Sequence, residues 1–171
     1  INSQSQCVYG FFDCCHSGTI LDLTYMSVID YQNNFPNISN FDQCIDYCKK
    51  NTNCVKSHYP NKINKVKGNI HLFSGCRDKQ YSYESEQNGT ITGHFTTQLC
   101  KILNHRNINN YSFEELYYLL VFFINNKSQI PVYSSNKDIP LKNIKPWEQI
   151  TTLSTYNYDL KSWLLLNYWS N

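Results

Sequence analysis

The stretch "CVYGFFDCCHSG", residues 7–18, joins a short apolar run to a cluster of turn-forming and reactive side chains. The run "CVYGFF" has the length of a fully buried strand, and the Asp, Ser and Gly of "DCCHSG" favour a turn directly after it. This placement leaves three interpretations open: a reactive site, a metal or disulfide element, and an ordinary loop. Because adjacent cysteines are more often structural than catalytic, the rest of the sequence has to decide between them.

Composition bounds the class of protein. The chain has 171 residues, a formal net charge of +2 and eight cysteines. This length supports one domain with a real core, and the near-neutral charge gives no reason to expect nucleic acid or an anionic membrane as a partner. The apolar run "LYYLLVFFI" (116–124) is about half the roughly 20 residues that span a bilayer, so no membrane segment is expected. The chain starts at Ile1 without a signal-peptide pattern, so we expect a fragment or a processed product.

The periodicity of apolar residues predicts strands and helices in alternation, which indicates the α/β class. Ser112 followed by Glu115 is a capping box at the start of a strongly apolar helix, and Ser39 or Asn40 can cap an earlier one. Pro131 inside a short apolar run predicts an edge strand. The expected elements are a strand over 7–12, a helix over 41–51, a strand over 70–73, helices over 90–105 and 112–126, and a strand over 129–135.

Two loops with reactive side chains follow predicted strands: "DCCHSG" (13–18) and "SGCRD" (74–78). In open α/β sheets, ligands collect outside the carboxyl ends of the strands, so we expect both loops to face one cleft. Cys15 has the setting of a nucleophile, because a thiol just past a buried strand can be partly exposed and its own amide can point at an oxyanion. His16 is not the natural base, because neighbouring side chains diverge. Asp13 points the same way as Cys15, and its carboxylate would disfavour a thiolate, which favours a role in binding a cation.

Two segments carry a resemblance to a known family. "DCCHSGTILDLTY" (13–25) resembles the active-site segment of the metacaspases, and "LFSGCRDKQYSYES" (72–85) resembles their second signature. Three later segments follow the family pattern in order: "GTITGHFTTQL", "YSFEELYYLL" and "SQIPVYSSNKDI". The resemblance covers residues 7 to about 140 and is closest to the type I metacaspases of AT-rich protists such as malaria parasites.

The resemblance implies a caspase-like α/β/α sandwich, present here as a partial domain without the early strands and the catalytic-histidine segment. It implies a division into the end of a large catalytic subunit, a polar basic linker, a small-subunit region and a C-terminal tail that packs on the domain. The corresponding residues are 1–26, 27–68, 69–140 and 141–171.

The resemblance also assigns roles to residues. Cys15 is implied as the nucleophile of a cysteine endopeptidase, and Asp13, with Asp78, is implied to shape a pocket for Arg or Lys before the cut. Asp22 matches a position that helps to bind activating Ca²⁺, a cation that needs about six to eight oxygen ligands. An enzyme specific for Lys or Arg could cut its own polar connection at Lys49, Lys50, Lys62, Lys65 or Lys67, and the alternative is that these lysines only solvate a basic loop.

The sequence departs from the family pattern in several places. Cys14 stands where the family has Ser, Thr24 replaces a Pro, and Tyr81, Tyr83 and Glu84 alter the second signature. The family's His-x-Gly-His-Gly motif, which supplies the catalytic base upstream of the nucleophile, is absent from the sequence.

The 171-residue chain is therefore expected to be inactive alone and to need the upstream half of its domain. We expect a monomeric, cytoplasmic protein that acts on protein or peptide substrates. The alternatives are a catalytically inert binding or regulatory relative and, less favoured, a secreted disulfide-containing binding module.

Overall fold

The computed structural model describes residues 7–15, 21–31, 35–59, 68–87, 90–124 and 128–145. The strands are β1 (Cys7–Phe12), β2 (Tyr25–Asp30), β3 (Asn53–His58), β4 (Asn69–Ser74), β5 (Glu84–Gln87), β6 (Thr90–Gly93) and β7 (Val132–Ser135). The α-helices are α1 (Phe41–Asn51), α2 (His94–Leu103) and α3 (Phe113–Ile124), and two short 3₁₀ turns cover Ile108–Asn110 and Leu141–Asn143. Within these residues, no helix combines the length and the apolar character needed to cross a membrane.

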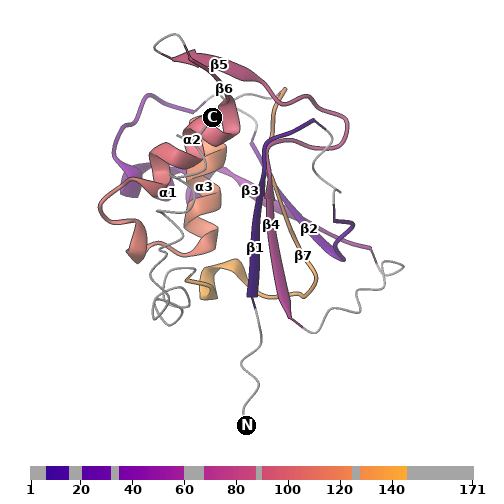
Figure 1. Cartoon of the computed structure of the whole chain (residues 1–171). Coiled ribbons are helices and arrows are strands. Elements are labelled where there is room, and N and C mark those ends of the chain that lie inside the picture. The colour runs from indigo at the N-terminus through magenta and orange to yellow at the C-terminus, as the bar shows by residue number, and fades with distance from the viewer. Residues whose placement is uncertain are drawn as a thin grey trace, which may run out of the picture.

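Five strands form the main sheet, in the order β1-β4-β7-β2-β3. β1 and β4 are parallel, while β7 is antiparallel to both β4 and β2, so β1, β4 and β2 run in the same direction. The register places Phe12, Ser74 and Val132 side by side at one end of the sheet. The loops that follow β1 and β4 therefore leave the sheet at the same end, and β5 and β6 form a separate hairpin beyond that end (Figure 1).

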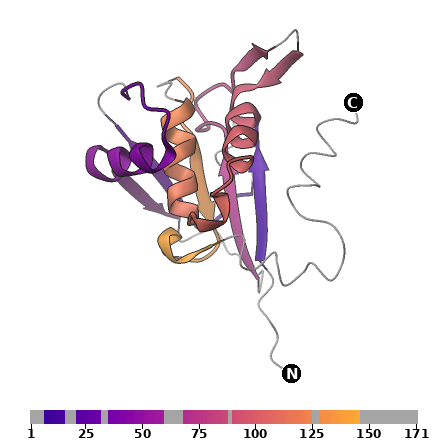
Figure 2. The same ribbon diagram turned by 90° about the vertical axis from the view of Figure 1, so that its left-hand side faces the viewer.

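All three described α-helices cover the same face of the sheet, and α3 lies between α1 and α2 (Figure 2). The core forms where α3 meets the sheet. Phe73 of β4 and Tyr133 of β7 pack their rings against Tyr117 of α3, and all three belong to one buried cluster that includes Leu116 and Leu120. Burial of such large apolar side chains stabilises the fold by about 1.5–3 kcal/mol each.

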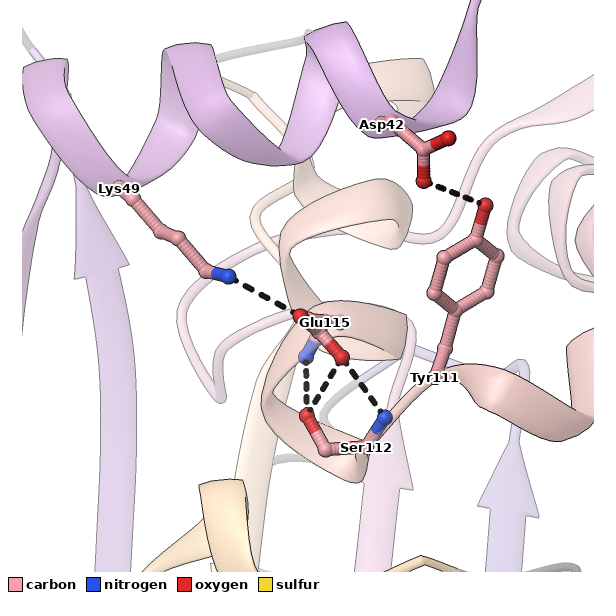
Figure 3. Close-up of polar contacts among 5 residues, drawn as sticks. All are labelled: Asp42, Lys49, Tyr111, Ser112 and Glu115. Carbon is pink, nitrogen blue, oxygen red and sulfur yellow. Dashed lines mark hydrogen bonds and ion pairs between the residues drawn. The ribbon is translucent and has the colours of Figure 1, made fainter.

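The capping box predicted for α3 is confirmed. Ser112 N donates to Glu115 Oε2 over 2.9 Å, and Glu115 N donates to Ser112 Oγ over 3.3 Å (Figure 3). Glu115 Oε1 also accepts a hydrogen bond from Lys49 Nζ at 3.0 Å, which connects the start of α3 to the last turn of α1. The cap of α1 is Asn40, whose Oδ1 accepts from Gln43 N.

The predictions of a strand over 7–12, a strand through 70–73 and a helix over 41–51 are confirmed. The edge position predicted from Pro131 is wrong, because β7 is the central strand of the sheet. Pro131 immediately precedes β7, so its missing N–H takes no donor away from the ladder. The local pattern is compatible with both positions, and only the pairing of β7 with β4 and β2 decides between them.

The helix predicted over 90–105 begins only at His94. Its first four residues form β6, because the β-branched Thr90, Ile91 and Thr92 suit a strand that pairs with β5. The stretch 27–68, expected as a polar linker, holds most of β2, all of α1 and all of β3 in its described part. The tail expected to pack on the domain lies, from residue 146 onward, outside the described residues.

Candidate functional site

The loops after β1 and β4 meet as the sequence predicts. Gly75 N donates a 2.8 Å hydrogen bond to Phe12 O, which continues the parallel pairing one step past the strands. Cys76 is buried, and its Sγ lies 3.4 Å from Cys14 O, under the loop that carries both adjacent cysteines. The two predicted reactive loops therefore form one structural unit.

Cys15 presents an exposed thiol at this edge, and its Sγ accepts a hydrogen bond from Ser82 N over 3.4 Å. The thiolate is the nucleophilic form of cysteine, and a backbone N–H aimed at the sulfur is a hydrogen-bond donor to that form. Other cysteines have a different setting: burial raises the pKa of Cys44 to about 11 and that of Cys48 to about 12. These two thiols of α1 are core residues that stay protonated at neutral pH.

Asp13 fixes the start of α2. Its Oδ2 accepts from Thr96 N at 2.9 Å and from Thr96 Oγ1 at 2.7 Å, while its Oδ1 accepts from Ser82 Oγ. Thr96 is the third residue of α2, and the helix has no side-chain cap of its own because Gly93 occupies the N-cap position. Asp13 thus caps α2 from the loop after β1, where a negative charge also interacts favourably with the helix dipole.

Two glycines make room for this carboxylate. A Cβ at Gly93 would stand 1.9 Å from Asp13 Oδ2, and a Cβ at Gly75 would stand 3.3 Å from Oδ1. The first distance is far inside van der Waals contact, so only glycine fits at position 93 while Asp13 holds its place. Among the described residues, no lysine or arginine forms an ion pair with Asp13.

Two glutamines fasten the loop after β4 to the start of β7. Gln80 Oε1 accepts from Arg77 N at 3.2 Å and from Ile130 N at 3.0 Å. Gln129 is fully buried and reaches the other way, accepting from Tyr83 N at 3.1 Å through Oε1. Its Nε2 lies 3.4 Å from Ser82 Oγ.

The remaining predicted site residues are more dispersed. Asp78 is half-buried in the loop after β4. Asp22 is exposed between β1 and β2, with a φ of 49° in the left-handed region. Lys49 and Lys50 lie in the last turn of α1, whereas Lys62, Lys65 and Lys67 lie outside the described residues.

A calcium site would need more than Asp22 alone. Across the described ranges, no group of three or more His, Cys, Asp or Glu side chains could hold a metal ion. The described residues therefore do not fit a complete Ca²⁺ site, for which about six to eight oxygens are required.

No described histidine ring is hydrogen-bonded to Cys15. His71, the most buried of them, is 2% exposed and lies on β4, with its Nδ1 2.7 Å from Tyr133 Oη. It pairs in register with Ser135, at the end of the sheet opposite to Ser74 and the reactive loops.

A cavity of about 320 Å³ lies at that opposite end, between β2, β7 and the turn at Leu141–Asn143. Its lining includes Tyr25 and Ser135, which are register partners on the neighbouring strands β2 and β7. This cavity is therefore separate from the end of the sheet at which Cys15 lies.

The fold and the site define a class of protein before any comparison. A mixed α/β domain that presents an exposed thiol just past a sheet strand, with a backbone amide on the sulfur, has the arrangement of a cysteine-nucleophile hydrolase. The sequence pattern of the caspase domain matches residues 3–139, and the chain belongs to this caspase-domain family of cysteine peptidases. The sheet of five strands and its three helices agree with a partial caspase-like fold, as the sequence predicts. No curated protein matches the sequence significantly.

Three residues around Cys15 and Asp13 have no role assigned by the sequence analysis: Ser82, Thr96 and Gln129. Ser82 and Gln129 lie inside segments that resemble the family. Serine and glutamine are ordinary polar residues in this chain, however, so their neighbours in sequence do not indicate a role for either of them. Their contacts with Asp13, Cys15 and each other exist only in the folded chain.

Proposed function

We propose that the chain is the nucleophile-bearing part of a type I metacaspase, an endopeptidase that cleaves after Arg or Lys. The observation that carries the proposal is that Ser82 hydrogen-bonds both the exposed Cys15 thiol, through its N–H, and the Asp13 carboxylate, through its hydroxyl. The match of the two segments that follow β1 and β4 to the metacaspase signatures supports the same assignment.

In the proposed reaction, the Cys15 thiolate attacks the carbonyl carbon of the scissile peptide bond. The C–N bond then breaks, a histidine protonates the departing amine, and water hydrolyses the resulting thioester. The amide of Cys15 would donate to the oxyanion. The histidine is proposed to come from the upstream part of the domain, where the family carries its His-x-Gly-His-Gly motif.

Specificity for a basic residue is proposed to come from Asp13. Its three hydrogen bonds fix the carboxylate in one orientation, and no described cation neutralises it. A guanidinium or ammonium of the substrate would therefore form a charge-assisted pair with it. Asp78, in the neighbouring loop, is proposed to contribute to the same pocket.

Autoprocessing is proposed at Lys62, Lys65 or Lys67, in the connection between β3 and β4. Lys49 and Lys50 are less suited, because they belong to a helix and Lys49 is paired with Glu115, whereas proteases cut exposed loops. Calcium stimulation, with Asp22 as one ligand, is proposed as well, and the other oxygen ligands would come from outside the described residues. The proposed setting is a monomer in the cytoplasm that acts on proteins or peptides.

The test is cleavage of peptide reporters ending in Arg, Lys or Asp by the full-length protein, with and without Ca²⁺. We expect cleavage after Arg and Lys only, and loss of at least about 10³-fold of the rate in Cys15→Ala, since the nucleophile is removed. The matched control is Cys54→Ala, which removes an exposed thiol from β3.

Activity retained in Cys15→Ala would show that the nucleophile is misassigned. Cleavage after Asp in place of Arg and Lys would overturn the specificity. A protein that cleaves none of the reporters would favour the alternative of an inert binding relative.

A further inference from the structure

We propose that Gln129 is a positioning residue that holds Ser82 in place, so that the Ser82 amide stabilises the Cys15 thiolate. The proposal rests on the proposed role of Cys15 as the nucleophile. It concerns a buried side chain that touches neither the sulfur nor the substrate pocket.

Ser82 is the centre of the arrangement. Its N–H donates to Cys15 Sγ over 3.4 Å, and its hydroxyl donates to Asp13 Oδ1. A serine hydroxyl has one proton to donate. Because that proton is given to Asp13, the oxygen is left as an acceptor, and the group that donates to it is Gln129 Nε2 at 3.4 Å.

The side chain of Gln129 is buried and hydrogen-bonded at both ends of its amide. It is 0% exposed, and its Oε1 accepts from Tyr83 N over 3.1 Å. A single amide thus holds two successive residues of the loop, Ser82 through its hydroxyl and Tyr83 through its backbone. Loss of a buried partner of this kind leaves the groups it was bonded to unsatisfied, which favours displacement of the loop.

Gln129 adjoins the central strand of the main sheet, since it lies three residues before β7. Gln80 reinforces the same junction from the other side, because its Oε1 accepts from Ile130 N at 3.0 Å. The position of the amide on Cys15 is therefore set by the middle of the sheet rather than by the loop alone.

The chain offers an internal reference for the test, because Cys14 and Cys15 are both exposed in the same loop. Alkylation with iodoacetamide at pH 7 would modify both, and chymotryptic cleavage after Phe12 and Leu21 would place them in one peptide for mass spectrometry. The measured quantity is the rate at Cys15 divided by the rate at Cys14. General loosening of the fold raises access to both cysteines, while displacement of the Ser82 amide lowers the rate at Cys15 only.

Two variants remove the proposed anchor. Gln129→Glu keeps the acceptor for Tyr83 N and removes the donor to Ser82, and Ser82→Ala removes the hydroxyl while keeping the backbone amide. We expect the rate ratio to fall about 3- to 10-fold in both, as the loss of one hydrogen bond implies. Ser82→Thr keeps a hydroxyl and should retain the ratio, and Gln43→Glu, on the exposed face of α1, should leave it unchanged.

An unchanged ratio in Ser82→Ala and Gln129→Glu would overturn the proposal. If Gln129→Glu does not fold, the comparison of Ser82→Ala with Ser82→Thr still decides it. Alkylation needs no histidine base, so the outcome is independent of peptidase activity. A lowered ratio in a protein that cleaves no reporter would support the positioning role of Gln129 and refute the proposed function. An unchanged ratio in a protein that cleaves the reporters would refute the positioning role and support the proposed function.

Discussion

His71 shows how burial fixes the state of a single titratable residue. Its ring is 2% exposed and stacks on Tyr9, with ring centroids 5.4 Å apart. Burial lowers the pKa of His71 to about 4, so the ring is neutral at pH 7. An unfolded histidine has a pKa of about 6.5. The unfolded chain therefore binds more protons than the folded chain between these two values.

We expect this difference to make the free energy of unfolding pH-dependent. The contribution of His71 is fully present above about pH 6.5 and is lost as the pH falls toward 4, which amounts to about 2 kcal/mol between pH 7 and pH 5. Urea unfolding at the two pH values measures it. His71→Phe should remove this part of the pH dependence, whereas His58→Gln, an exposed histidine on β3, should not. A full pH dependence in His71→Phe would contradict the assignment.

At the scale of an element, the start of α3 depends on its capping box. Glu115 accepts from Ser112 N, from Ser112 Oγ and from Lys49 Nζ. Burial raises the pKa of Glu115, but the hydrogen bonds from Ser112 and Lys49 outweigh it and leave the pKa below its ordinary value. The stabilisation is therefore complete above the unfolded value, about 4.3, and is lost as the pH falls through the folded one.

Removal of the cap should cost a predictable amount. We expect Ser112→Ala to lower the free energy of unfolding at pH 7 by roughly 1 kcal/mol, because the N–H of Glu115 loses its acceptor. Thermal or urea unfolding measures it. The matched control is Ser39→Ala, an exposed serine that adjoins the cap of α1 but is not the cap, and it should change stability by less than about 0.5 kcal/mol. Equal effects of the two substitutions would show that the box contributes nothing.

At the scale of the whole molecule, Tyr117 ties the helical layer to the sheet. The side chain is 1% exposed, and its hydroxyl accepts from Ile29 N at 3.3 Å. The same hydroxyl lies 3.0 Å from Ser27 O and 2.8 Å from Pro131 O, either of which can take its proton. The hydroxyl of one residue of α3 thus contacts backbone groups of β2 and of the residue that precedes β7.

Loss of this hydroxyl should weaken the packing of α3 on the sheet. We expect Tyr117→Phe to destabilise the chain by about 1–3 kcal/mol, because buried backbone groups lose their partner. Urea unfolding gives the value. Tyr118→Phe is the matched control, since Tyr118 is the next residue of α3 and its hydroxyl makes no hydrogen bond with the described residues; its effect should stay below about 0.5 kcal/mol. A Tyr117→Phe variant as stable as the parent would refute this role.

Local chemistry made several features predictable from sequence. The strand over 7–12, the helix over 41–51 and the capping box at Ser112 depend on neighbours within a few positions, which a sequence displays directly. The strand-then-turn pattern of residues 7–18 likewise placed Cys15 and Asp13 at the carboxyl end of a strand.

The sheet order and the environment of the site were decided only in the folded chain. Pro131 indicated an edge, yet β7 is central, because pairing with β4 and β2 depends on residues about 60 and 100 positions away. By itself the sequence determined the strand over 7–12, the helix over 41–51 and the capping box, and it placed Cys15 and Asp13 just after the first strand, since these features follow from side-chain type and spacing. The tertiary structure alone decided that Ser82 and Gln129, 47 positions apart, would hold that pair, because hydrogen bonds between distant segments form only where packing brings them within reach.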